Sequence, residues 1–184
     1  ITGTMLLDFG IMWELTGSEA LGLFINQDLA VIPLFLMMGS LMAVSGVSSD
    51  IYRLASATFG FFRGGLAMAT VAGSAGFGSV TGSSLATVAT IGGMALPEMR
   101  RRRYGDGLAA GSVAAGATLG ALIPPSTPIV IYAIVVEESI GKLFIAAMVP
   151  ALITIILYML AIALVVRLRP DSAPAAQAFD GAEF

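Results

Sequence analysis

With 184 residues, of which 57% are hydrophobic and only 11% charged, this chain is too apolar for an ordinary soluble domain, in which about 25% of residues are charged. Its mean hydropathy of +0.93 indicates that a lipid bilayer is its solvent. The sequence contains no cysteine or histidine, which excludes disulfides, thiolate nucleophiles, the usual zinc sites and histidine-based acid–base catalysis.

The first part of the chain predicts a connecting segment and one membrane span. Residues 1–28 contain acidic side chains but no lysine or arginine, and we interpret them as a periplasmic connection. Residues 29–46 form an uncharged run just long enough to cross the hydrocarbon as a helix. Residues 50–63 carry apolar side chains along one stripe, which predicts an amphipathic helix at the membrane interface. Because the chain starts at Ile1 without a methionine or a signal peptide, we interpret it as a fragment.

Residues 64–98 are the most informative stretch, because they carry no charge before Glu98. One straight helix of this length would measure about 50 Å, against a hydrocarbon core of about 30 Å. Two complete spans would need about 40 residues and a turn. Glycine and hydroxyl residues, which break and cap helices, are concentrated from Gly76 to Ser84. We therefore predict a re-entrant hairpin of two short helices that enters and leaves the bilayer on one side.

Residues 107–136 form another uncharged stretch, and prolines interrupt it. Pro124, Pro125 and Pro128 cannot all lie inside one helix, because proline lacks an N–H donor and clashes with the preceding turn. We predict a transmembrane helix broken near its middle, with the irregular segment at 116–126.

The last part of the chain predicts another span, at 143–166, and a polar cytoplasmic tail at 167–184 that is rich in proline and alanine. Together the elements predict an all-α polytopic membrane protein with a re-entrant helical hairpin and a discontinuous transmembrane helix. This combination leaves the two interruptions as the places where chemistry is expected.

The basic residues are distributed asymmetrically if 64–98 is a hairpin. All the arginines then lie on one side of the membrane, and Lys142 lies on the other beside Glu137 and Glu138. The positive-inside rule places the arginine side in the cytoplasm. In so apolar a chain we interpret the arginines as topology anchors beside anionic lipid, and not as a nucleic-acid patch; they are Arg53, Arg63, Arg100, Arg101, Arg102, Arg103, Arg167 and Arg169.

Both interruptions would leave unpaired backbone groups at membrane depth, which is costly unless they are buried in protein or line a wet cavity. Free N–H groups at helix N-termini suit an anion, and free carbonyls suit a hard cation such as sodium. Neither interruption contains a charged side chain, so sodium bound by neutral oxygens is favoured over a proton relay. The available hydroxyls are those of Ser79, Thr81, Ser83, Ser84, Thr87, Thr118, Ser126 and Thr127.

Two motifs occur together in this chain. Thr81-Gly82-Ser83-Ser84 lies in the predicted hairpin, and Leu122-Ile123-Pro124-Pro125-Ser126 lies in the predicted broken helix. With these motifs the chain, over about residues 29–166, resembles the large membrane subunit of tripartite ATP-independent periplasmic (TRAP) transporters. The resemblance implies two inverted halves that work as an elevator, each with a hairpin and a broken helix. This chain would hold most of the N-terminal half.

The resemblance also implies a function: sodium-coupled symport of an organic anion, such as a C4-dicarboxylate or sialic acid, across the bacterial inner membrane. A periplasmic binding protein would deliver the substrate, a small membrane subunit would pair with the large one, and sodium would be the coupling ion, with no cofactor. Sodium ligands would come from Ser83, Ser84 and Thr118. The implied ion and substrate residues are Thr81, Gly82, Ser83, Ser84, Thr87, Thr118, Gly120, Pro124, Pro125 and Ser126.

Other functions remain open at this point. A sodium–dicarboxylate symporter that acts without a binding protein would share the same hairpin and broken helix. A membrane-embedded enzyme, such as a lipid phosphatase, would need an acid, base or activated nucleophile near the hairpin, and neither interruption contains an ionisable side chain. A purely structural subunit would leave two costly interruptions without a function.

Overall fold

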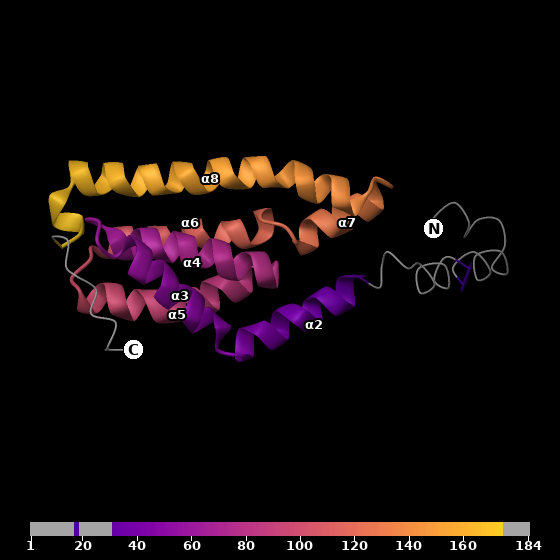
Figure 1. Cartoon of the computed structure of the whole chain (residues 1–184), viewed down its shortest axis with the longest axis horizontal. Helices are drawn as coiled ribbons and strands as arrows, with labels where there is room; N and C mark the ends of the chain where they lie inside the picture. Colours follow the sequence, from indigo (N-terminus) through magenta and orange to yellow (C-terminus); the bar gives the residue numbers. More distant parts are fainter. Residues whose placement is uncertain (1–16, 19–30, 175–184) are drawn as a thin grey trace, which may run out of the picture.

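The structure of this chain, a computed structural model, describes residues 17–18 and 31–174. Within these ranges it contains helices and no strand, so the predicted all-α fold is confirmed for that part of the chain. Most helices lie side by side in an elongated bundle, and α2 extends away from it at an angle (Figure 1). The predicted connection 1–28 falls almost entirely outside the described residues. The elements are α2 (Val31–Val44), α3 (Val47–Phe59), α4 (Gly65–Thr81), α5 (Ser84–Arg101), α6 (Asp106–Leu122), α7 (Thr127–Val135), α8 (Ile140–Leu168) and the 3-10 turn η1 (Pro170–Ser172).

The helices α2 and α3 differ in their bounds from the predicted segments 29–46 and 50–63. Gly46 has a φ of 82°, and this left-handed residue ends α2 and starts α3 earlier than predicted. The helix α2 contains 14 residues, or about 21 Å, which is less than the hydrocarbon thickness. On α3, Tyr52 is buried against α4, whereas Leu54 of the predicted apolar stripe is 71% exposed.

The helices α4 and α5 are joined by a short turn at Gly82 and Ser83. Gly82 has a φ of 58°, and its N–H donates to the Gly78 carbonyl at 2.7 Å. The Ser83 hydroxyl oxygen then caps α5 by accepting from the Ala86 N–H at 3.3 Å. The interruption is shorter than the predicted one, because residues 76–81 belong to α4. Small residues there allow other helices to approach closely, and this packing outweighs their weak helix propensity.

Both ends of this helical hairpin lie at the same end of the bundle. The Leu66 N–H, in the first turn of α4, donates to the hydroxyl of Tyr104, which follows α5, at 3.3 Å. Gly64, just before α4, packs against Val166 near the end of α8. With 17 and 18 residues, α4 and α5 are each about 26 Å long, whereas α8 with 29 residues is about 43 Å long. The turn therefore lies only part of the way along α8 (Figure 1).

The helices α6 and α7 are the two pieces of the interrupted helix. The prediction that the irregular segment covers 116–126 is wrong in its first half, because α6 continues to the residue before Ile123. Ile123 is extended, with φ −80° and ψ 127°, as expected for a residue that precedes a proline. Pro124 cannot supply an N–H to the helix, and Ser126 stands at the N-cap position of the new helix α7 without a capping hydrogen bond from its side chain. The prolines, and not the glycines before them, end α6.

Two segments in the described part of the chain are long and apolar enough to cross a membrane, namely 106–135 and Ile140–Leu168. The second is longer at both ends than the predicted span 143–166. Large apolar side chains of α8 such as Leu152 and Leu160 are more than half exposed. Exposed apolar surface on this scale is typical of contact with lipid or with another protein.

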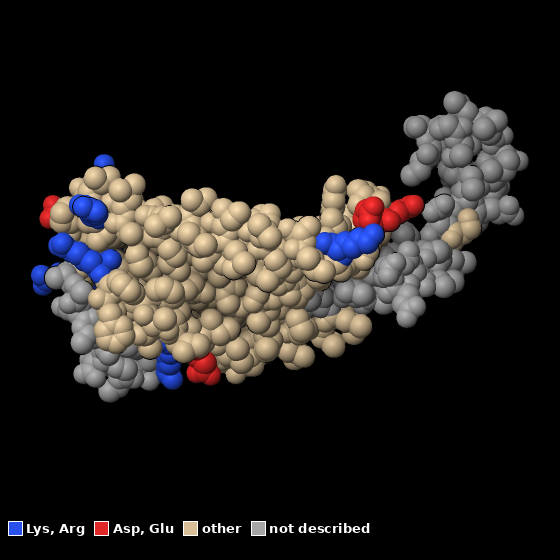
Figure 2. Space-filling model, turned by 45° about the horizontal axis from the view of Figure 1, so that its top comes forward, with Lys and Arg blue, Asp and Glu red and all other residues tan. Residues whose placement is uncertain are grey.

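Most charged side chains in this view gather at the ends of the bundle, and a few lie on its flank (Figure 2). Most of the basic ones lie where α4 and α6 begin and where α5 and α8 end. At the start of α8, Lys142 pairs with Glu138 at 4.0 Å. Arg53 is exposed on α3. We call the end where α4 and α6 begin and α5 and α8 end the arginine end; its basic residues are Arg63, Arg100, Arg101, Arg102, Arg103, Arg167 and Arg169.

Candidate ion and substrate site

The turn between α4 and α5 packs against the backbone of α6 just before the proline interruption. A Cβ atom on Gly120 would lie 2.8 Å from the Thr87 hydroxyl oxygen and 3.0 Å from the Ser83 carbonyl oxygen. A Cβ atom on Gly78 would lie 2.5 Å from the Cα of Gly120. Only glycine fits these distances without movement of the backbone. We call this region the turn–break contact; it comprises Gly78, Ser83, Thr87 and Gly120.

The helix α2 approaches the same turn from another side. A Cβ atom on Gly39 would lie 3.0 Å from the carbonyl oxygen of Thr81. Thr81 and Thr87 are buried, with 3% and 0% exposure. The helices α2 and α6 therefore cover the turn and bury Thr81 and Thr87, whereas Ser83 and Ser84 are half-buried.

The threonine hydroxyls of the turn donate hydrogen bonds within their own helices. Thr81 Oγ1 donates to the Phe77 carbonyl at 3.1 Å, and Thr87 Oγ1 donates to the Ser83 carbonyl at 2.8 Å. A hydroxyl that has donated its one hydrogen presents only lone pairs to its other neighbours. Both threonines are thus better arranged to bind a hard cation than to donate to an anion. The Ser83 hydroxyl, which accepts from the Ala86 N–H, retains its own hydrogen.

The interruption after α6 leaves the backbone carbonyls of Gly120 and Ala121 without their usual partners, because residues 124 and 125 are both prolines. In a continuous helix the Gly120 carbonyl would accept from the N–H of residue 124, but Pro124 has none. The next carbonyl, of Ala121, accepts a hydrogen bond from the buried Ser126 hydroxyl. Gly120 therefore contributes both the close approach to Ser83 and an oxygen that its own helix does not use.

Most of the predicted site residues lie in or next to the turn–break contact. Gly82 and Ser83 form the turn, Thr87 and Gly120 face each other, and Ser84 is the half-buried first residue of α5. The remaining predicted residues of the interruption directly follow α6 and are Pro124, Pro125 and Ser126.

Thr118 lies elsewhere. Its hydroxyl donates to the Ala115 carbonyl at 2.7 Å and lies 3.2 Å from the Tyr158 hydroxyl of α8. Residues two apart in an α-helix are separated by about 200° around its axis, so Thr118 and Gly120 lie on nearly opposite sides of α6. The structure thus separates Thr118 from Ser83 and Ser84, with which it was expected to share a sodium ion.

The described residues contain no group of three or more His, Cys, Asp or Glu side chains that could hold a metal ion. A cation at the turn–break contact would therefore meet only neutral hydroxyl and carbonyl oxygens. Such a ligand set is suited to a singly charged hard cation, whereas divalent calcium or magnesium usually takes carboxylate ligands.

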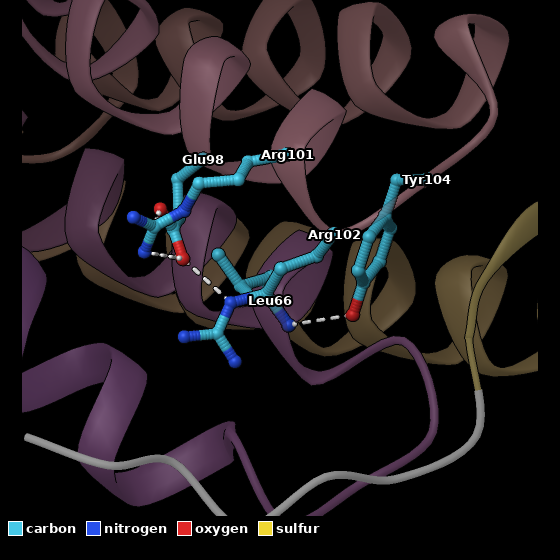
Figure 3. Close-up of polar contacts among 5 residues, drawn as sticks. All are labelled: Leu66, Glu98, Arg101, Arg102 and Tyr104. Atoms are coloured by element: carbon cyan, nitrogen blue, oxygen red, sulfur yellow. Dashed lines mark hydrogen bonds and ion pairs between the residues drawn. The ribbon is translucent and has the colours of Figure 1, made fainter.

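A buried carboxylate joins the basic residues at the arginine end. Glu98, in the last turn of α5, is 6% exposed and pairs with Arg101 at 3.0 Å and with Arg102, whose side chain is 16% exposed (Figure 3). Nearby, burial raises the pKa of the Tyr104 hydroxyl, whose oxygen accepts a hydrogen bond from the Leu66 N–H. Arg102 is therefore held within the protein by its ion pair with Glu98.

Replacing Glu98 with alanine is expected to destabilise the purified protein by about 2 kcal/mol, because a half-buried guanidinium then loses its charged hydrogen-bond partner. Glu138→Ala is the matched control, since Glu138 forms an exposed pair with Lys142 and contributes about 0.5 kcal/mol or less. Thermal unfolding in detergent measures both. Equal unfolding temperatures for the two variants would contradict a structural role for Glu98.

Comparison with known proteins identifies the family. Residues 9–180 match the family model described as "Tripartite ATP-independent periplasmic transporter, DctM component". The chain is 43% identical over 144 residues to the C4-dicarboxylate TRAP transporter large permease protein DctM of Pseudomonas aeruginosa, an alignment that covers 78% of this chain and 34% of that protein. It is 35% identical over 158 residues to the sialic acid TRAP transporter large permease protein SiaM of Vibrio cholerae, covering 83% and 37%. It is 41% identical over 123 residues to the isethionate TRAP transporter permease protein DctMQ of Oleidesulfovibrio alaskensis, covering 67% and 19%.

The chain spans about a third of the length of the first two relatives. All three are named as transporter permeases, in agreement with the prediction of a transporter and not an enzyme. Because the family match extends over almost the whole chain, the resemblance seen in the sequence is confirmed: the chain belongs to the family of the DctM component, the large permease of TRAP transporters.

Proposed function

We propose that this chain forms the hairpin and broken helix of the N-terminal half of a large permease subunit, which transports an organic anion by symport with sodium. The observation that carries the proposal is the turn–break contact. It is a buried meeting point of a helix turn and a helix interruption, and it offers uncharged oxygens from Thr87 and Gly120.

The lengths of the helices support a re-entrant hairpin. Both ends of α4–α5 lie at the arginine end, and each helix is about 26 Å long, so the turn stops short of the far membrane surface. A turn at this depth needs protein around it to satisfy its backbone, and α2 and α6 supply that cover. An even number of crossings also keeps all the basic ends of these helices on the cytoplasmic side.

The site offers ligands for both a cation and an anion: oxygen lone pairs suit sodium, and free N–H groups at helix N-termini suit the substrate anion. Sodium would be bound by the Thr81 and Thr87 hydroxyls and by the Gly120 carbonyl, all of which present lone pairs. The substrate anion would lie at the N-termini of α5 and α7, where N–H groups of the first turn lack helical acceptors. Sodium bound first would order the turn and so create the anion site, which is the differential binding that coupling requires.

The names of the relatives support an organic anion as the substrate. C4-dicarboxylates, sialic acid and isethionate differ in size, but each carries a carboxylate or a sulfonate. The family description, with three components, supports a periplasmic binding protein and a small membrane subunit as partners in the bacterial inner membrane. The isethionate relative is a single permease protein and is named DctMQ.

Uptake by the complete transporter in proteoliposomes tests the function. The full-length permease with its small subunit should accumulate a C4-dicarboxylate or another organic acid when an inward sodium gradient and the loaded binding protein are present. A potassium gradient should not drive uptake. Equal uptake without the binding protein would favour the independent symporter, and equal uptake without sodium would reject the coupling.

Cysteine labelling tests the hairpin in a full-length permease from which any other cysteine has been removed; this chain itself contributes none. Phe62→Cys and Gly107→Cys, which flank α4–α5 at exposed positions, are expected to react with an impermeant maleimide from the same membrane face. Glu138→Cys should react from the opposite face. If Phe62→Cys and Gly107→Cys react from opposite faces, α4–α5 is not re-entrant.

A further inference from the structure

A cavity of about 410 Å³ lies between α6 and α8 near the arginine end, apart from the turn–break contact. Small residues of α6 form one wall and side chains of α8 form the other. The residues used below are Gly107, Gly111 and Ala115 of α6, and Tyr158, Ile162 and Arg169 at α8.

Hydrogen bonds connect α6 and α8 on both sides of this cavity. At the arginine end the Gly105 N–H, just before α6, donates to the Ser172 carbonyl, just after α8, at 3.0 Å. Farther into the bundle, the hydroxyls of Thr118 and Tyr158 lie 3.2 Å apart. The two contacts hold the helices at a spacing that their small residues do not fill, so the cavity is a built feature of this pair of helices.

The dimensions of the cavity match one leaflet of a bilayer. From Tyr158 to Arg169 the helix rises about 17 Å, which is close to half of the roughly 30 Å hydrocarbon thickness. The side chain of Ile162 and the surfaces of Gly111 and Ala115 make the walls apolar over this distance. Both helices belong to segments long and apolar enough to cross a membrane, and in the proposed membrane arrangement the cavity would face acyl chains.

The charge lies only at the end of the cavity. Arg169 is the one charged residue in its lining, and it forms no ion pair within the described part of the chain. Two acids lie near this end: Asp106 pairs with Arg100 at 3.3 Å, and Asp171 is exposed in η1. The N–H of Gly107, in the first turn of α6, lacks a helical acceptor and lines the same end. An occupant must therefore have an apolar body about one leaflet long and an anionic head.

We propose that this cavity binds one anionic phospholipid from the leaflet at the arginine end. The lipid phosphate lies at Arg169 and the start of α6, and one acyl chain lies along Gly111 and Ala115 between the two helices. Anionic lipid is attracted to a basic residue at the membrane surface, and the apolar walls add selectivity for a chain of matching length.

Native mass spectrometry of the full-length permease with its small subunit tests the proposal, with phosphatidylglycerol or phosphatidylcholine added as the probe. Gly111→Leu fills the cavity without a clash, because no atom lies within 4 Å of a Cβ placed there. Gly93→Leu is its matched control, since Gly93 lies on α5 and also has open space within 4 Å. Arg169→Gln removes the head-group contact, and Arg167→Gln controls for the loss of one charge nearby.

The wild type and Gly93→Leu are expected to retain one phosphatidylglycerol, which Gly111→Leu loses. Arg169→Gln should weaken phosphatidylglycerol binding about fivefold and leave phosphatidylcholine binding unchanged, whereas Arg167→Gln should have less than a twofold effect. Three results would overturn the proposal: equal retention by Gly111→Leu and Gly93→Leu, equal binding of the two lipids to the wild type, or no retained lipid because another part of the permease fills the cavity.

Discussion

Replacing Gly120 with alanine is expected to reduce sodium-driven uptake at least tenfold while the protein still inserts into the membrane. The added methyl group would lie 2.8 Å from the Thr87 hydroxyl oxygen and 3.0 Å from the Ser83 carbonyl oxygen. The second of these is backbone, so the turn must move away from α6, at a cost of about 1–3 kcal/mol. Movement of a few tenths of an ångström separates the oxygens proposed to bind sodium. Initial uptake rates in proteoliposomes measure the effect.

Two further variants make this result specific. Gly93→Ala is the control, because a Cβ atom there meets nothing within 4 Å, and it should transport at the wild-type rate. Gly78→Ala approaches the same contact from α4, 2.5 Å from the Cα of Gly120, and should lose transport as Gly120→Ala does. If Gly120→Ala transports as fast as Gly93→Ala, the turn–break contact is not part of the transport site.

Replacing Thr87 with valine is expected to raise the sodium concentration for half-maximal uptake about tenfold, which corresponds to about 1.4 kcal/mol. Valine has nearly the shape of threonine but lacks the oxygen that would bind the ion. Uptake at saturating sodium should fall much less, because the turn keeps its packing. Measuring uptake against sodium concentration at fixed substrate separates the two effects.

Thr70→Val is the matched control for this variant. Thr70 is also 0% exposed, and its hydroxyl also donates to the carbonyl four residues earlier at 2.8 Å, that of Leu66. It lies near the arginine end of α4, away from the turn. The loss of a buried hydroxyl and of one hydrogen bond is thus common to both variants, and only Thr87→Val should change the sodium dependence. The same shift in both would show that Thr87 acts through stability and not as an ion ligand.

The sequence by itself determined the features that depend on local chemistry. A charge-free stretch too long for one span and too short for two predicts a hairpin, and the structure contains α4 and α5 joined at Gly82 and Ser83. Prolines that lack N–H donors predict a helix interruption, and α6 ends just before Pro124. Both conclusions need only the length of a helix and the hydrogen-bonding capacity of each residue.

Only the tertiary structure decided which residues share a site. Glycines at 76–78 read as helix breakers in the sequence, but they lie inside α4, because close packing against other helices outweighs their poor propensity. Nothing in the sequence distinguishes Gly39 or Gly78 from other glycines that pack helices together. Thr118 and Gly120 both lie in the predicted irregular segment 116–126, and the sequence does not show that they face different sides of α6. Their roles depend on how α2, α4 and α6 are rotated about their axes, and residues distant in the sequence set that rotation.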